Sequence, residues 1–321
     1  MIWYITRRIL QLIPLVLGIT FMSFAIMKLA PGDYLSTMRQ NPDISPETIA
    51  RLSADFGLDK PWLVQYLIWI KNAFHGDFGY SFTYKMPVFQ LIGSYAGATL
   101  LLSLTSLLFS YCVALPMGIY AATHKNGLID RIASVLAAAG IALPGFFVAI
   151  LALMFAESTG WFPVAGMESN NYSSLSAVGK VLDVGKHLIL PTLVLGTRGV
   201  ASIMRMMRGN LLDVLSENYI LAARARGMSE RVVIIKHAAR SAINPLITMF
   251  GGDLGGLLAG AALVENVMAW PGLGRLLLAS VQSKDLYVAM GSFIMGAGML
   301  IVGNLIADVL LAVTDPRIKF S

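Results

Sequence analysis

Six long blocks of apolar residues constrain the fold of this chain more than any other feature. They lie at about 9–29, 96–122, 132–156, 187–204, 246–265 and 289–312. A helix needs about 20 mostly apolar residues to cross the hydrocarbon core of a bilayer. Charged residues make up only 13% of the chain, against roughly 25% in soluble domains. The sequence therefore predicts an all-α integral membrane protein with six transmembrane helices in contact with membrane lipid.

The basic residues show which loops are cytoplasmic. They precede the first block, lie between the second and third and between the fourth and fifth, and end the chain: Arg7, Arg8, Lys125, Arg131, Arg205, Arg208, Arg224, Arg226, Arg231, Lys236, Arg240, Arg317 and Lys319. The positive-inside rule places these loops and both termini in the cytoplasm. The net charge of +6 does not indicate a nucleic-acid partner, because no interleaved basic and aromatic patch accompanies it. We expect the N-terminal stretch to be an uncleaved helix rather than a signal peptide.

The outer segment 31–95, between the first two blocks, is predicted to contain helices. Ser45 is suited to cap a helix with Pro46 at its first position, and Gly57 is suited to end it. A second helix is predicted from Pro61 onwards. Its apolar face consists of Trp62, Leu63, Tyr66, Leu67 and Ile70. This face either packs within the segment or lies along the membrane surface.

The cytoplasmic loop 205–245 is predicted to fold as two helices joined by a sharp turn. Apolar residues recur at helical spacing along 211–226, and Gly227 can take the left-handed conformation that ends a helix. Ser229 can cap a second helix, and Glu230 suits the positive end of its dipole. Two such helices are too small to hold a core of their own. The loop therefore either lies on anionic lipid or docks a partner protein.

Ionisable residues inside the apolar blocks are few, namely Arg198, Asp253 and Asp308. An unpaired carboxylate in a span costs at least about 2.5–3.5 kcal/mol, so Asp253 should face protein or water. Two interpretations remain open: Asp253 lines a substrate pathway, or it pairs with Arg198 or with a neighbouring subunit. No relay of acidic residues crosses several blocks, which disfavours an ion-coupled carrier.

Motifs of enzymes are missing from the sequence. Gly179 and Lys180 are followed by Val181, so there is no phosphate-binding Gly-x-x-x-x-Gly-Lys-Ser/Thr loop. The predicted topology divides the four histidines between the two sides of the membrane, where they cannot gather around one metal. They are His75, His124, His187 and His237. We expect no catalytic residue, metal site or cofactor in this chain.

The loop motif Ala222-Ala223-Arg224-Ala225-Arg226-Gly227 resembles the Glu-Ala-Ala…Gly loop of permease subunits in binding-protein-dependent ABC importers, with Leu221 where the general pattern has Glu. The later residues His237, Arg240 and Pro245 are similar to the peptide-transport branch. In that family the loop forms a coupling helix that inserts into a groove of the ATPase subunit. The resemblance assigns this role to Ala222, Ala223, Arg224, Ala225, Arg226, Gly227, Ser229, Glu230, His237 and Arg240.

Further motifs that look like the same branch follow in order along nearly the whole chain. They are Pro31-Gly32-Asp33, Gly57-Leu58-Asp59-Lys60-Pro61, Gln65-Tyr66, Gly76-Asp77-Phe78-Gly79-Tyr80-Ser81, Val264-Glu265, Trp270-Pro271-Gly272-Leu273-Gly274 and Asp315-Pro316-Arg317. One departure is Lys284-Asp285-Leu286-Tyr287, where the family usually has Arg-Asp-Tyr-Pro. The family uses the turn of Trp270, Pro271, Gly272 and Gly274 in an outer gate. A rigid turn that only orients two spans is the alternative.

The resemblance implies a type I importer architecture, with one transmembrane permease domain over 1–321 in a bacterial or archaeal inner membrane. The expected partners are a second permease subunit, two ATPase subunits that bind ATP and Mg, and an extracytoplasmic substrate-binding protein. ATP would close the ATPase subunits, and the coupling helices would then move and open the spans outward. Di- or oligopeptides are the implied substrate, with nickel or another small solute as the alternative. The carboxylate of Asp253 could then meet the ammonium end of a peptide.

Overall fold

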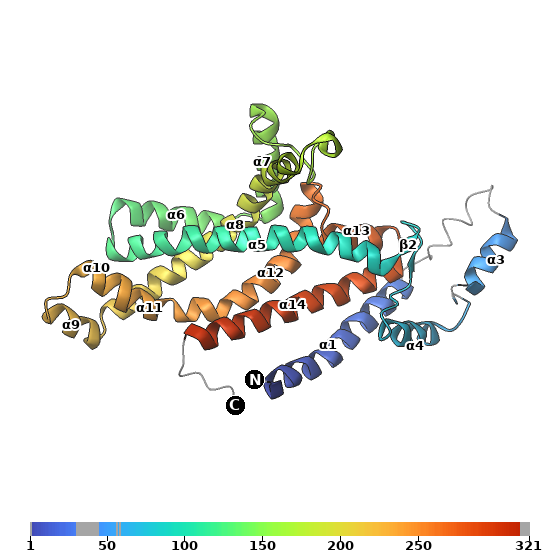
Figure 1. Ribbon diagram of the computed structural model, residues 1–321, viewed down its shortest axis with the longest axis horizontal. Helices are drawn as coiled ribbons and strands as arrows, with labels where there is room; N and C mark the ends of the chain where they lie inside the picture. The colour runs from blue at the N-terminus through green and yellow to red at the C-terminus, as the bar shows by residue number, and fades with distance from the viewer. Residues whose placement is uncertain (1, 30–44, 56, 58, 315–321) are drawn as a thin grey trace. The chain divides into compact units, whose positions relative to one another are not determined.

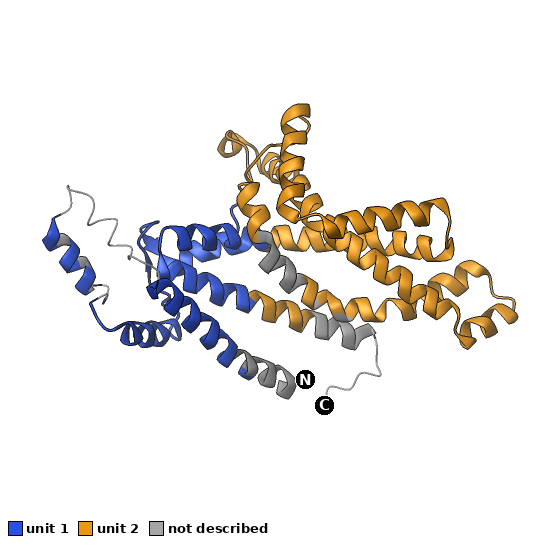
Figure 2. Ribbon diagram, turned by 180° about the vertical axis from the view of Figure 1, so that it is seen from behind, with its two compact units in different colours: residues 1–99, 271–298 blue, residues 100–270, 299–321 orange. Residues whose placement is uncertain are grey.

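The computed structural model describes residues 2–29, 45–55, 57 and 59–314, and these residues are predominantly helical (Figure 1). The chain divides into two compact units, coloured separately in Figure 2. Unit 1 comprises residues 1–99 and 271–298, and unit 2 comprises 100–270 and 299–321. The motifs at 31–33 and 315–317, residue Leu58 and the rest of the outer segment at 31–44 lie outside the described residues.

Five of the six predicted blocks are single long helices. These are α1 (Ile2–Leu29), α5 (Val88–Thr123), α8 (Ala177–Leu215), α12 (Asn244–Val267) and α14 (Leu286–Thr314). Prolines lie inside α1, α5 and α8 without ending them.

The third block, predicted as one span, is a bent pair. The helices α6 (Leu128–Ala142) and α7 (Gly145–Thr159) meet at an angle of 106°. Leu143 between them is extended, with φ −78° and ψ 131°, because the ring of Pro144 disfavours the helical conformation of the residue before it.

Length and composition identify three described helices that could each cross a membrane. They are Val88–Thr123, Ala177–Leu215 and Leu286–Ile306, and the bent pair would add a fourth. Ile13–Leu29 is a shorter apolar helix. The integral membrane character of the chain is thus confirmed, while the count of six spans remains a prediction.

The core of unit 2 forms around α8. The helices α6, α7 and α12 all pack against α8. Met204, Met207 and Leu211 of α8 are fully or almost fully buried. A Cβ atom on Gly196 of α8 would clash with the ring of Phe109 in α5, so glycine permits this close approach. A short 3₁₀ helix, η1 (Tyr172–Ser174), lies between α7 and α8.

Unit 1 contains both predicted outer helices, as α3 (Pro46–Asp55) and α4 (Trp62–Ala73). Tyr66 and Trp69 of α4 pack with Phe24 of α1 and Met290 of α14, whereas Leu67 is exposed. Part of the predicted apolar face of α4 therefore packs within the protein. The strands β1 (Tyr80–Ser81) and β2 (Met86–Pro87) form a small antiparallel hairpin, and α13 (Leu273–Gln282) precedes α14. Neither the β-hairpin nor α13 was expected from the sequence.

Candidate functional sites: a cytoplasmic segment and a charged cavity

The helix predicted over 211–226 is interrupted in the structure. The helix α8 ends at Leu215, and α9 (Asn218–Ala225) begins three residues later. At the break, the hydroxyl of Ser216 donates to the carbonyl of Asp213 at 2.6 Å, and the backbone N–H of Ser216 donates to the same oxygen at 3.2 Å. This local pairing competes with helical bonding, so α9 can leave the axis of α8.

Gly227 ends α9 as predicted. Its φ angle is +76°, and its N–H donates to the carbonyl of Arg224 at 2.9 Å. A Cβ atom at this position would meet no atom within 4 Å. The backbone conformation, rather than a shortage of space, is therefore what favours glycine here.

Ser229 occupies the predicted cap position of α10 (Glu230–Val232), but its side chain forms no capping hydrogen bond. The capping role expected from the sequence is thus wrong. Glu230 instead accepts two hydrogen bonds from Arg224, with Nε–Oε2 at 3.1 Å and Nη2–Oε1 at 2.6 Å. This pairing lowers the pKa of Glu230 and raises the pKa of Arg224. The ion pair bridges the turn on either side of Gly227.

The second half of the loop is a π-helix, η2 (Val233–Ala238), followed by α11 (Ala239–Ala242). We call residues 216–243 the 216–243 segment; Figure 1 shows it at the end of α8. Five of its apolar side chains are buried in one cluster with Met207 and Leu211 of α8. They are Ile220, Ala223, Val233, Ala238 and Ala242.

Two hydrogen bonds add to this packing. The amide of Asn210 in α8 donates to the carbonyl of Ala242 at 3.1 Å. The hydroxyl of Tyr219 donates to Ser241 Oγ at 3.1 Å. The first bond fixes the 216–243 segment to α8, whereas the second is exposed and joins two parts of the segment to each other.

The outer side of the 216–243 segment is exposed and mixes apolar with basic groups. Leu221 has 51% of its surface exposed, and Ile235 has 57%. Of the residues assigned to coupling, Ala223 is buried, while Arg224 and His237 are half-buried. The others are exposed: Ala222, Ala225, Arg226, Gly227, Ser229, Glu230 and Arg240. These exposed apolar and basic side chains are available for docking a partner protein.

Arg198 and Asp253 line the same cavity of unit 2, which has a volume of about 650 Å³. The structure thus brings together the two ionisable residues that the sequence placed in separate spans. We call this site the charged cavity. Helices α5, α7, α8 and α12 and the Pro144 turn form its walls. The ion pairs of the described residues do not include one between Arg198 and Asp253, so direct pairing of these two residues is not observed.

Tyr111 of α5 is the side-chain partner of Asp253. Its hydroxyl lies 2.8 Å from Asp253 Oδ2 and 3.0 Å from the carbonyl of Leu246. Sequence reasoning missed Tyr111, because 142 residues separate it from Asp253. Tyr111 also shares its block with other hydroxyl side chains, among them Ser106, Ser110 and Tyr120, so its residue type did not single it out.

The predicted outer-gate turn is buried and well bonded. Trp270 is fully buried, and its N–H donates to the carbonyl of Glu265 at 2.8 Å. The left-handed residue is Ala269, with φ +53°, whereas Gly272 has φ −102° and ψ 168°. Gly272 is thus in a conformation open to any residue. Gly272 stands out because it is buried, and not because of its backbone angles. The half-buried Pro271 and Gly274 flank it.

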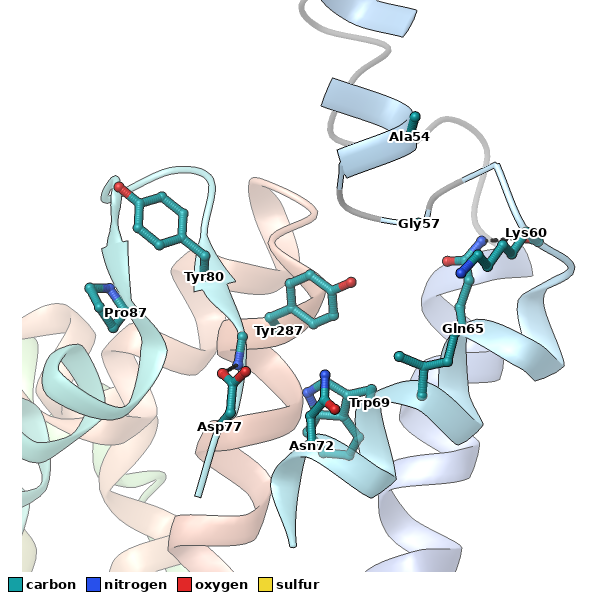
Figure 3. Close-up of a pocket in the computed structure, with 12 residues that line it drawn as sticks. Ala54, Gly57, Lys60, Gln65, Trp69, Asn72, Asp77, Tyr80, Pro87 and Tyr287 are labelled. Carbon is teal, nitrogen blue, oxygen red and sulfur yellow. Dashed lines mark hydrogen bonds between the residues drawn. The ribbon is translucent and has the colours of Figure 1, made fainter. Parts of the chain in front are cut away.

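Unit 1 has a cavity of about 450 Å³, which residues of the outer segment and Tyr287 of α14 line (Figure 3). Figure 3 shows Trp69, Tyr80 and Tyr287 around it. Lys60 and Asp77 supply charges of both signs. Aromatic rings with polar groups at a rim are typical of protein-recognition surfaces. This cavity includes residues of the Gly76–Ser81 motif.

Comparisons with known proteins identify the family of the chain. Residues 114–320 match the family described as binding-protein-dependent transport system inner membrane component, and residues 1–105 match its N-terminal family. The oligopeptide transport system permease AppB of Bacillus subtilis is 40% identical over 99% of both chains. The dipeptide transport system permease DppB of Escherichia coli K12 is 38% identical over 99% of both chains. The glutathione transport system permease GsiC of Salmonella choleraesuis is 37% identical over the whole of both chains.

The fold is also similar to that of a chain in the inward-facing MetNI methionine ABC transporter. The TM-score is 0.57 at 17% identity, over 70% of this chain and 97% of that chain. At that identity the likeness supports the fold alone. With family matches that cover nearly all of its length, the chain belongs to the inner membrane components of binding-protein-dependent transport systems.

Proposed function

We propose that this chain is the permease subunit of an ATP-driven importer that moves di- or oligopeptides across a bacterial or archaeal inner membrane. The observation that carries this proposal is the full-length similarity to permeases named for dipeptide, di/tripeptide and oligopeptide transport, at 34–40% identity. A related permease named for glutathione favours a second candidate, import of another small solute by the same type of complex.

The complex we propose contains a second permease subunit, two ATPase subunits and an extracytoplasmic substrate-binding protein. Six spans place both termini in the cytoplasm, in line with the basic loops. ATP and Mg bind the partner ATPases, since this sequence has no phosphate-binding loop of its own. The proposed role of this chain is thus to form the transport pathway, while its partners hydrolyse ATP.

The 216–243 segment is the proposed docking element for the ATPase. Its exposed outer side offers Leu221, Ala222 and Arg226, while its inner side is buried against α8. Because close-packed interiors transmit strain, a displacement of α9 is passed to α8. The same helix carries Arg198 in the charged cavity. This connection supports ATP-driven movement of α8 as the step that opens the pathway.

The outer face is the proposed contact surface for the binding protein. The Trp270–Gly274 turn is the proposed part of the outer gate, and the unit 1 cavity, with its aromatic and charged groups, is a proposed contact site for the binding protein. Both regions carry motifs of the peptide-transport branch.

Affinity purification of the chain in mild detergent from its native membranes tests this proposal. We expect a second permease and ATPase subunits to co-purify in near-equal amounts, as judged by mass spectrometry. The complex should then catalyse ATP-dependent peptide uptake once it is reconstituted with its binding protein. A homodimer or monomer that drives uptake with an ion gradient and without ATP would contradict the proposal.

A further inference from the structure

We propose that the charged cavity of unit 2 is a transit site for a short peptide in its zwitterionic form. Asp253 binds the α-ammonium group of the peptide, and Arg198 binds its α-carboxylate. This inference rests on the proposed function and adds a binding site and a recognition chemistry to it. Every residue used in the argument belongs to unit 2.

Arg198 and Asp253 do not pair with each other, so both side chains can bind a ligand. Arg198 and Asp253 line one cavity, yet no ion pair of the described residues joins them. Among the described residues, the guanidinium of Arg198 also makes no hydrogen bond, although it carries five N–H donors. Charged groups inside a span are costly unless they face water or a partner of opposite charge. A ligand that carries one charge of each sign satisfies both residues at once.

Tyr111 holds the carboxylate of Asp253 in place without saturating it. A carboxylate has about four acceptor sites, and the hydroxyl of Tyr111 uses one of them at 2.8 Å. The described residues offer no other hydrogen bond to this side chain. An ammonium group has three donors, and a charge-assisted bond to a fixed carboxylate is among the stronger hydrogen bonds in proteins. Tyr111 is therefore a positioning residue for Asp253.

The rest of the wall is suited to peptides of varied sequence. Apolar side chains line most of it: Leu107, Phe146, Val194, Leu195, Ile203 and Leu263. Among the lining residues that the structure describes, Ser110 and Ser202 carry the uncharged polar side chains. Such a wall excludes few apolar or small side chains, while the two charges select the termini common to all unmodified peptides. The volume of about 650 Å³ is within the range of about 300–1,000 Å³ of small-ligand sites.

Uptake by the complete reconstituted transporter is the first test. We expect Asp253→Asn and Arg198→Gln each to lower dipeptide uptake about tenfold or more, as follows from losing a hydrogen bond between charged groups. ATP hydrolysis stimulated by loaded binding protein should stay within about twofold, because the 216–243 segment is unchanged. The double variant should lose more than either single variant. Glu157→Gln on α7 and Arg131→Gln on α6 are exposed controls outside the cavity.

The double variant separates ligand binding from internal pairing. Recovery of uptake in the double variant would mean that the two residues only neutralise each other, which would overturn the proposal. Unchanged uptake in both single variants would overturn it too. If the wild-type complex shows no ATP-dependent peptide uptake at all, the proposed function itself fails.

Cysteine labelling tests occupancy without changing either charge. Ser202→Cys places a thiol in the cavity wall, and Cys112→Ser removes the one native cysteine of the chain. The complete permease–ATPase complex is labelled with a small thiol reagent in the absence of binding protein, and mass spectrometry follows this chain. We expect a millimolar free dipeptide to slow labelling several-fold. The same dipeptide with acetylated and amidated ends should not slow it.

Adding Asp253→Asn to this background should abolish the protection by free dipeptide. Equal protection by free and blocked dipeptides would show that the ends are not recognised, and absence of protection by either would show that peptide does not occupy the cavity. Both results overturn the proposal whether or not Asp253→Asn assembles.

Discussion

Arg208 of α8 and Asp130 of α6 form a two-contact ion pair, with Nε 2.6 Å from Oδ1 and Nη2 2.9 Å from Oδ2. Asp130 has only 3% of its surface exposed and also accepts the N–H of Asn126 at 2.9 Å. The pair therefore fixes both the first turn of α6 and the loop before it against α8. In the proposed mechanism α8 links the charged cavity to the 216–243 segment, so α6 should move together with α8.

Removing the arginine of this pair should destabilise unit 2. Arg208→Ala leaves the buried carboxylate of Asp130 without its counter-charge, which costs about 3–5 kcal/mol in buried pairs. The side chain of Arg208 is 25% exposed. We therefore expect the free energy of unfolding to fall by an amount near the lower end of that range, about 3 kcal/mol. Thermal unfolding of the purified complex in detergent measures it. As a control, Arg131→Ala changes the exposed neighbour of Asp130 and should leave the unfolding temperature unchanged. An unfolding temperature of Arg208→Ala equal to that of the wild type would contradict the prediction.

Replacing Gly227 should uncouple ATP hydrolysis from transport. A β-branched residue at φ +76° is strained, at a cost on the order of 1–3 kcal/mol. Gly227→Val should thus displace the turn after α9 and lower the peptide transported per ATP hydrolysed in proteoliposomes. Gly227→Asn is the matched control, because asparagine tolerates the left-handed region. Equal coupling ratios for the valine variant and the wild type would argue against docking of the ATPase at this turn.

The Arg224–Glu230 pair should make the turn of the 216–243 segment sensitive to acid. The pairing lowers the pKa of Glu230 from the ordinary value of 4.5. The ion pair therefore stabilises the turn fully above pH 4.5, and this stabilisation is lost as the pH falls through the lowered pKa. We expect NMR titration of ¹³C-labelled glutamate carboxyls in nanodiscs to give a midpoint below 4.5 for Glu230.

Arg224→Gln should return the Glu230 midpoint to the ordinary range, and high salt should do so in part because the pair is exposed. The exposed Glu157 on α7 is the internal reference in the same spectra. A Glu230 midpoint that does not respond to Arg224→Gln would show that this ion pair does not form in the membrane-embedded protein.

Apolar periodicity predicted the long helices of this chain but not the points where they break. The prolines at 14, 116 and 191 lie inside α1, α5 and α8, whereas Pro144 separates α6 from α7. A proline alone therefore did not distinguish a continuous helix from a 106° bend. At Pro144 a glycine follows directly, and the two together give a stronger signal. The break at Ser216 has neither residue, since a serine hydroxyl forms it.

Whether residues of the candidate sites could be predicted depended on whether their roles require contacts with residues far apart in the sequence. Gly227 could be assigned from its residue type, because its role depends on its own φ angle. Arg198 and Asp253 could be chosen as rare charges in apolar blocks, but only the packing of α8 and α12 places them at one cavity. Tyr111 gave no comparable signal, because the role of its half-buried hydroxyl follows from its acceptor, which only the fold reveals.

Asp285 should hold the β1–β2 hairpin of unit 1. It is fully buried, and its Oδ2 accepts hydrogen bonds from Ser81 Oγ at 2.7 Å and from the N–H of Thr83 at 3.0 Å. Asp285→Ala leaves the fully buried hydroxyl of Ser81 without this acceptor, at a cost of about 1–3 kcal/mol for an unsatisfied buried group. We expect backbone amides of residues 80–87 to exchange about tenfold faster or more, as measured by hydrogen–deuterium exchange with mass spectrometry on the intact complex.

Asp59→Ala is the matched control, since Asp59 is an exposed aspartate of the same unit. Exchange in residues 80–87 should be unchanged in this variant. The faster exchange in Asp285→Ala should be confined to the hairpin and to the turn before α14. The 216–243 segment belongs to unit 2, so its exchange should not change. Equal exchange at the hairpin in Asp285→Ala and the wild type would mean that packing of the neighbouring aromatic side chains, rather than this buried carboxylate, fixes the hairpin.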